Sequence, residues 1–460
     1  MNFSGLFSWI PDVRGPSGKL GFNDKLKWTL IILGAFFVLA NIPLFGLAQN
    51  SLERFEYLAI ILGTDFGSII SLGIGPIVMS SIIIQLLVGA GILPIDTSTH
   101  EGKRSFQGLQ RVGVIVFILF EAVVYVVMGG LQATPGFAGL VIFQLILGGF
   151  AIMLMDQLST KWGFASGTSL FILAGVAWRI FTGLFQFIGP TGENCLVDFT
   201  NTPCAGNLLI ILQSVINGAP TEALSAFATI AVTIIIFCVV IWVQNMKVEI
   251  PLSYDRLRGY GVSWPLPFFY ASVLPVILVA ALVANIQLFA GMIENWLGHT
   301  TFLGGFSQGQ AISGLSYWLG TSNLVESIIR GSLQGSQIGQ AVIHLMFFMI
   351  FGAIFAIFWV KTSGMDESAQ AKKILSSGLQ IPGFRKDERV LESVLKRYIL
   401  PLTIMGGLAI GALAALSDTL GALTSGTAIL LAVMISYQLY QNIAQQHAVD
   451  MHPALQKVFS

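Results

Sequence analysis

The chain has 460 residues, of which 55% are hydrophobic and only 10% are charged, and its mean hydropathy is +0.80. Soluble domains carry charge on about a quarter of their residues, so this composition excludes an ordinary soluble enzyme. Basic and acidic residues are equal at 23 each, which removes any whole-chain electrostatic attraction to nucleic acid. The three cysteines are too few for a disulfide scaffold and lack the spacing of a zinc site.

Apolar stretches long enough to cross a bilayer, about 20 residues each, recur along the chain and are separated by polar or Gly/Pro-rich breaks. The sequence therefore predicts an all-α polytopic membrane protein with ten transmembrane helices. In chain order they are expected at residues 28–48, 74–93, 112–131, 137–157, 164–188, 223–245, 266–290, 338–360, 399–417 and 422–441.

The distribution of basic residues supports this layout. With ten spans, alternate loops lie on the same side of the membrane, and 20 of the 23 Lys and Arg residues fall on the side that holds both termini. The exceptions are Arg54, Arg179 and Arg330. Basic loops remain in the cytoplasm, so we expect a multi-pass cell-membrane protein with cytoplasmic N- and C-termini.

Residues 52–73, between the first two spans, are too apolar for a loop and too charged for a span. Glu53, Arg54, Glu56 and Asp65 would make a full crossing costly. Two alternatives remain: an amphipathic helix in the membrane interface, or a short re-entrant helix buried within the protein.

The sequence lacks the common catalytic and nucleotide-binding motifs. It contains none of HExxH, GxSxG, GxxxxGKS/T or CxxC, so we expect no enzymatic activity, no metal site and no cofactor. Glu121 is the one carboxylate that this layout places well inside a span, which gives little support for a proton pathway. We therefore expect His344, in the eighth span, to be a packed or interfacial histidine rather than a proton relay.

Two of the cysteines share a loop on the side opposite the termini. In the predicted topology, Cys195 and Cys204 face an oxidising compartment, where a disulfide can form. We predict that they pair and that the bond has a structural role.

The second span, LGIGPIVMSSIIIQLLVGAGI at residues 72–92, resembles the SecY family of protein-conducting channels. Further segments match the same family in order and extend the resemblance over all ten predicted spans. The ending and the VEIPL loop look like the archaeal and eukaryotic branch. These segments are FQGLQR (106–111), ASGTSLFILAGV (165–176), VEIPLSYDRLRG (248–259), LPVILVAALVANIQL (274–288), FWVKTSGMD (358–366), GFRKDERVLESVLKRYILPLT (383–403) and MHPAL (451–455).

The resemblance implies two inverted five-helix halves around an hourglass-shaped pore. The halves would be residues 1–190 and 207–442, followed by a cytoplasmic tail at 443–460. Residues 52–68 match the re-entrant plug helix, which seals the resting channel outside its constriction. The plug residues expected by this match are Glu53, Arg54, Glu56, Tyr57, Ile60, Ile61, Thr64 and Asp65.

The resemblance also implies a ring of apolar side chains at the constriction. Because aliphatic groups offer ions no hydrogen bonds, such a ring resists their passage. Thr168 departs from the aliphatic pattern, so that either the ring is slightly wetter or the match is shifted by one position in the fifth span. The six expected ring residues are Ile74, Val78, Thr168, Ile172, Ile277 and Leu431.

Two further sets of residues follow from the same resemblance. A lateral gate between the second and seventh spans would include Glu121 and Asn285, with Met79 and Ser80 facing them. Basic residues in two cytoplasmic loops would bind the ribosome, where cations meet RNA phosphates. These are Arg256, Arg258, Arg385 and Lys386.

The function expected from these features is that of the central subunit of a protein-conducting channel. Secretory polypeptides would cross through the ring. A hydrophobic signal sequence would open the lateral gate, and apolar segments would leave sideways into lipid. The implied partners are SecE-like and Sec-beta-like small membrane subunits, the ribosome, nascent polypeptides and the lipid bilayer. The alternatives are a secondary transporter of small solutes with broken helices and a membrane scaffold or insertase without an aqueous pore.

Overall fold

The structure is a computed structural model. It describes residues 12–18, 20–47, 67–89, 92–93, 95, 100–127, 131–189, 193–197, 199, 202–254, 261–271, 274–307, 310–376, 379–380 and 387–451.

Long apolar helices dominate the described residues, and one of them overlaps each of the ten expected spans, although the first ends at Ala40 rather than at residue 48. Eight of these helices are long and apolar enough to cross a membrane by themselves. Of the other two, α2 carries Asp24, Lys25 and Lys27 in its first turns, and α4 has 15 residues. The ten are α2 (Phe22–Ala40), α4 (Gly75–Gly89), α5 (His100–Val127), α6 (Ala138–Trp162), α7 (Gly167–Phe185), α9 (Pro220–Gln244), α10 (Leu274–Leu297), α13 (Gly335–Thr362), α15 (Glu388–Leu420) and α16 (Gly426–Met451).

Several helices extend beyond the expected apolar segments. Helix α5 begins at His100, α15 begins at Glu388, and α16 continues to Met451, into the predicted tail. Hydropathy marks the edge of the membrane, whereas the i to i−4 hydrogen bonds of a helix continue into water. The seventh span was expected from residue 266, which is wrong: strand β2 continues to Pro267, and α10 begins only at Leu274.

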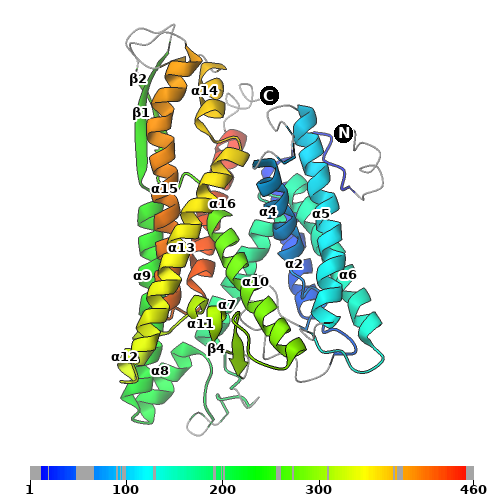
Figure 1. The fold of residues 1–460 in the computed structure, drawn as a ribbon, viewed down its shortest axis with the longest axis vertical. Coiled ribbons are helices and arrows are strands. Elements are labelled where there is room, and N and C mark those ends of the chain that lie inside the picture. The colour runs from blue at the N-terminus through cyan, green and yellow to red at the C-terminus, as the bar shows by residue number, and fades with distance from the viewer. Residues whose placement is uncertain are drawn as a thin grey trace.

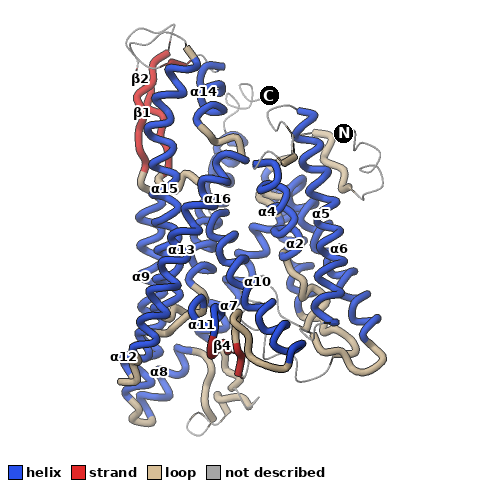
Figure 2. Tube along the Cα trace, in the orientation of Figure 1, coloured by secondary structure: helices blue, strands red, loops and turns tan. Residues whose placement is uncertain are grey.

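Short elements lie at the two ends of the helices (Figures 1 and 2). One end, called the sheet end here, holds β1 (Lys247–Tyr254), β2 (Gly261–Pro267), β5 (Leu379–Gln380) and α14 (Glu367–Ser376). The opposite end, called the far end, holds α8 (Asn207–Ile216), α11 (Gly314–Leu319), α12 (Leu324–Ile329), β3 (Gly305–Ser307) and β4 (Gln310–Ser313).

The sheet end is built on an antiparallel sheet with the order β2-β1-β5. Ile250 of β1 pairs with Trp264 of β2, and its side chain belongs to an apolar core formed with α13, α14 and α15. Tyr270, just before α10, donates a hydrogen bond to the carbonyl oxygen of Met365 (2.6 Å), which precedes α14. The sheet is therefore attached to the membrane helices through side-chain packing as well as through the chain.

Glycines allow a close contact between α13 and α15. A Cβ on Gly352 would lie 2.8 Å from the carbonyl oxygen of Gly407, and one on Gly411 would overlap the carbonyl of Phe348. Small residues let helix backbones approach in this way. The largest apolar core joins these helices to α2, α7, α9, α10 and α16.

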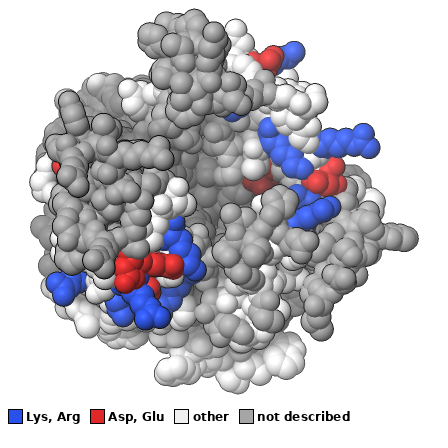
Figure 3. Space-filling view, turned by 90° about the horizontal axis from the view of Figure 1, so that it is seen from above, with Lys and Arg blue, Asp and Glu red and all other residues white. Residues whose placement is uncertain are grey.

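Figure 3 shows the molecule from the sheet end. Most of the described basic and acidic side chains visible there form two groups, one on the side of α14 and α15 and one on the side of α5 and α6. The charges thus lie around the edge of this end, as expected for groups excluded from the hydrocarbon core.

Candidate functional site

Five of the six expected ring residues meet in one apolar core. Ile74, Ile172 and Leu431 are buried within it, and Val78 and Ile277 pack against it. They come from the start of α4 and from α7, α10 and α16, so segments far apart in the sequence converge here. Branched aliphatic side chains from these helices therefore share one core, and Ile74, Val78 and Ile277 also line one cavity.

Thr168, the sixth expected ring residue, is hydrogen-bonded to α6. Its backbone N–H and its hydroxyl both donate to Oδ1 of Asp156 on α6, at 2.7 and 2.9 Å. The preceding Gly167 allows this approach, because a Cβ there would lie 2.5 Å from the Cα of Asp156. The hydroxyl is thus used to hold the start of α7 against α6.

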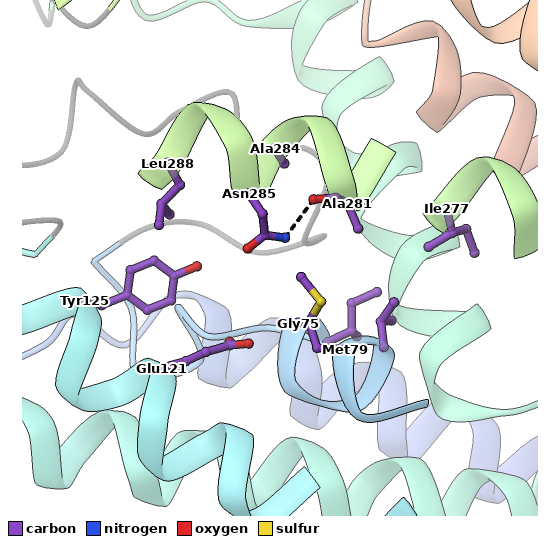
Figure 4. A pocket seen from close by; sticks show the side chains of 11 residues that line it. Gly75, Met79, Glu121, Tyr125, Ile277, Ala281, Ala284, Asn285 and Leu288 are labelled. Carbon is purple, nitrogen blue, oxygen red and sulfur yellow. Dashed lines mark hydrogen bonds between the residues drawn. The ribbon is translucent and has the colours of Figure 1, made fainter. Parts of the chain in front are cut away.

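A cavity of about 50 Å³ lies where α4 and α5 face α10 (Figure 4). It has room for a few water molecules and is far too small for a polypeptide. Its lining is Ile74, Gly75, Val78 and Met79, then Glu121 and Tyr125 of α5, and Ile277, Ala281, Ala284, Asn285 and Leu288 of α10.

Three of the four expected gate residues line this cavity. Asn285 and Glu121 face it from α10 and α5, and Met79 faces it from α4 (Figure 4). The Asn285 amide donates to the carbonyl oxygen of Ala281 in its own helix (2.6 Å). The same cavity also includes three ring residues, so the expected ring and gate are neighbours in space.

Ser80, the fourth expected gate residue, faces α5 instead. Its side chain is fully buried, and its hydroxyl donates to the carbonyl oxygen of Gln110 (2.8 Å). Tyr125 also lines the cavity and was not among the expected gate residues. Its position four residues after Glu121 places both on one face of α5, which is the signal that could have identified it.

Cys195 and Cys204 are joined by a disulfide with a Cα–Cα distance of 5.3 Å. Gln213 of α8 supports the same loop, since its side-chain oxygen accepts from the N–H of Cys204 (3.1 Å). Its amide nitrogen donates to the carbonyls of Phe199 and Thr202. The bond therefore lies in a loop that is also fixed by hydrogen bonds at the far end.

Other expected site residues lie outside the described part of the chain. These are the plug residues between Glu53 and Asp65, and the basic residues Arg256, Arg258, Arg385 and Lys386. The ends of β1 and β2 adjoin the first basic pair, and the start of α15 adjoins the second. Among the residues that are described, no group of three or more His, Cys, Asp or Glu could hold a metal ion.

Comparison with known proteins identifies the family of this chain. The SecY family model matches residues 68–440. The protein translocase subunit SecY of Methanothermobacter thermautotrophicus is 41% identical over 458 residues, which cover 98% of this chain and 97% of that protein. The chain belongs to the SecY family. The SecY of Methanocaldococcus jannaschii is 38% identical over 452 residues, with 98% of each chain covered.

Solved structures of SecY relatives have the same fold over nearly the whole chain. One, described as "The structure of a protein conducting channel", has a TM-score of 0.82 and 36% identity, and covers 99% of both chains. Another, "Sec61 in the Canine ribosome-channel complex from the endoplasmic reticulum", has a TM-score of 0.80 and 35% identity, again over 99% of each chain. The prediction of a ten-helix, non-enzymatic membrane protein of the SecY family is confirmed.

Proposed function

We propose that this SecY chain is the central subunit of a channel that passes secretory polypeptides across the cell membrane and releases apolar segments into lipid. The observation that carries the proposal is that one apolar core includes Ile74, Ile172 and Leu431 and is packed by Val78 and Ile277. The full-length similarity to translocase subunits and protein-conducting channels supports it. It also favours a channel over a solute transporter or a scaffold without a pore.

In this proposal these five side chains form the constriction. A narrow collar of aliphatic side chains cannot replace the hydration shell of an ion, so it blocks ions and remains dry. Flexible side chains such as Ile277 and Leu431 can still move apart around an extended polypeptide. Thr168 supports the start of α7, where Ile172 lies one turn further along.

The contact of α4 with α10 is the lateral gate. Its polar groups, Glu121 and Asn285, lie on opposite sides of the small cavity. Interhelical polar contacts in membranes contribute about 0.6 to 2 kcal/mol each, which is weak enough for an apolar signal sequence to displace. The small cavity volume corresponds to a closed gate.

The sheet end is cytoplasmic, and both termini are on the cytoplasmic side of the membrane. The positive-inside rule supports this orientation. The disulfide between Cys195 and Cys204 at the opposite end also supports it, because disulfides persist in oxidising compartments. Residues 1–190 and 207–442 form the two inverted halves, with 443–460 as the tail, and residues 52–68 form the plug. A SecY relative is described by its plug domain, which "stablizes the closed state of the translocation channel".

The ribosome binds at the sheet end. Arg256 and Arg258 stand in the sequence between β1 and β2, and Arg385 and Lys386 stand just before α15. Cations of this kind bind RNA phosphates. The structure of a relative in a ribosome-channel complex supports this assignment. SecE-like and Sec-beta-like subunits complete the complex at the lipid-facing surface, and signal sequences bind at the lateral gate.

Crosslinking of a translocating chain tests the proposal. A photoreactive amino acid at Ile277 should crosslink to a secretory polypeptide arrested in transit. The same probe at Ile350, which is half exposed on α13, should not crosslink, because the lipid-facing surface does not contact the client. Equal crosslinking at both positions, or none at Ile277 while the client is protected from external protease, would contradict an axial path through the ring.

A further inference from the structure

A buried polar pair lies at the far end of α13 and α15. His344 of α13 and Asp418 of α15 have side chains that are 0% and 1% exposed, and His344 Nε2 lies 3.6 Å from Asp418 Oδ2. The imidazole also packs on the ring of Phe348, with 4.5 Å between the centroids. This pair has no role in the function proposed above, and isolated buried charges are costly.

The hydrogen bonds of His344 determine how many protons the pair holds. His344 Nδ1 lies 2.8 Å from the carbonyl oxygen of Leu319, and a carbonyl only accepts, so Nδ1 carries a hydrogen. Nε2 of a neutral imidazole would then present a lone pair to the carboxylate oxygen of Asp418. Two acceptors facing each other repel, so one proton must lie on Nε2 or on Oδ2.

The other oxygen of Asp418 caps a helix. Oδ1 accepts a hydrogen bond from the N–H of Gly426, the first residue of α16, at 2.5 Å. The positive end of the helix dipole favours an ionised carboxylate at this position. Residue 426 must be glycine for this contact, because a Cβ would overlap the side chain of Ser417.

The turn between α15 and α16 also closely approaches Asn323 and is hydrogen-bonded to α9. Gly421 ends α15 in the left-handed conformation, with φ of 73°, and a Cβ there would lie 3.0 Å from Oδ1 of Asn323. The N–H of Leu423 donates to the hydroxyl of Thr233 on α9 (3.0 Å). Asp418 thus accepts the hydrogen bond from the first residue of α16, and His344 lies between Asp418 and the rest of α13.

We propose that His344 and Asp418 form a charged pair that positions the first turns of α16 and, through them, Leu431 at the constriction. The aspartate holds the N-terminus of α16, and the histidinium holds the aspartate. His344 is thus a positioning residue for the closed channel. The effect on the constriction rests on the function proposed above, whereas the pairing itself does not.

A double-mutant cycle in the full chain, isolated in its membrane complex and reconstituted into vesicles, tests the pair. The variants are His344→Gln, Asp418→Asn and the double substitution. Each is assayed for thermal stability and for ion leak. Thr403→Val is the matched control, because that buried hydroxyl bonds only to Ile399 of its own helix.

We expect each single variant to lower the Tm and to raise the ion leak on the order of tenfold or more, because each leaves the other group buried without its partner. The double variant should recover most of both losses, since two neutral amides can hydrogen bond without a buried charge. Thr403→Val should leave the leak unchanged.

The outcomes separate the two parts of the proposal. Additive effects on Tm, or a double variant that fails to accumulate when the singles do, would overturn the pair. Coupled Tm values without any change in leak would overturn its action on Leu431.

If the singles do not accumulate, a stable and closed double variant supports the proposal, and an unstable or leaking one contradicts it. A parallel Ile277→Asn sample that fails to leak would count against the proposed ring rather than against the pair.

Discussion

Ser80 of α4 is seated directly against Gly113 of α5: a Cβ on Gly113 would overlap the hydroxyl of Ser80. The same hydroxyl donates to Gln110, and the Gln110 side chain contacts Ser81. Helices α4 and α5 are therefore packed as one unit. An opening of the lateral gate should move this unit away from α10 without separating its two helices.

Gly113→Ala should destabilise the protein by about 1 to 3 kcal/mol, the usual cost of overpacking a tight contact. Adding Ser80→Gly should recover part of this loss, because it removes the overlapping atoms. The measurement is the thermal midpoint in detergent, with Gly139→Ala as the control, since nothing lies within 4 Å of a Cβ at that position. Equal effects at Gly113 and Gly139 would contradict the packing described.

Asp12 joins the N-terminal segment to two helices. Its carboxylate lies 3.2 Å from Arg111 of α5 and 2.6 Å from Lys161 of α6. Partial burial acts to raise the pKa of Asp12, but the hydrogen bond from Lys161 and the charges of Arg111 and Lys161 outweigh it and hold the pKa below its usual value. The side chain is 45% exposed, so solvent screens the pair.

Because the folded-state pKa is the lower one, the stabilisation from Asp12 is present above the unfolded pKa of about 3.9 and is lost as the pH falls through the folded value. Asp12→Asn should thus cost at most about 1 kcal/mol at neutral pH and nothing in strong acid. Thermal midpoints of both proteins from pH 7 down to pH 3 test this. A difference that grows as the pH falls would have the wrong sign.

The disulfide between Cys195 and Cys204 closes a short loop with a sequence separation of 9. Loop-closure entropy predicts that its removal costs about 2 to 3 kcal/mol. A reductant should therefore lower the thermal midpoint of the native protein and leave the Cys195→Ser, Cys204→Ser variant unaffected. Mass spectrometry after alkylation supplies the check: two additional labels on the unreduced native protein, beyond that on Cys238, would show that the bond is absent.

The sequence predicted the helices better than their ends. Ten apolar segments became ten helices, because burial of backbone polar groups in lipid permits little else. Hydropathy could not show that α15 begins at Glu388, since its first turns lie outside the apolar segment and are held by the core of the sheet end. The sheet was not predicted, because β1 and β2 contain prolines and lie next to the spans. Strand pairing in the structure, such as that of Ile250 with Trp264, reveals them.

The site was predictable as far as residue type and order allowed. Resemblance to a family named the apolar positions, five of which converge, but it could not give the rotation of each side chain. Neighbouring helical residues point about 100° apart, so Met79 reaches the cavity while Ser80 faces α5. His344 was expected to be packed or interfacial, and it is buried. Its pairing with Asp418 depends on the contact of two helices and is not visible in the sequence.

Single-channel conductance in planar bilayers tests the central claim, that this chain forms a sealed pore. The comparison is between the intact protein with its partner subunits and a variant lacking residues 53–66. We expect a closed intact channel and frequent ion-conducting openings after the deletion, because only the apolar ring would then separate the two aqueous sides. If both proteins stay silent where a control channel opens, the assignments of the plug and of the pore are contradicted.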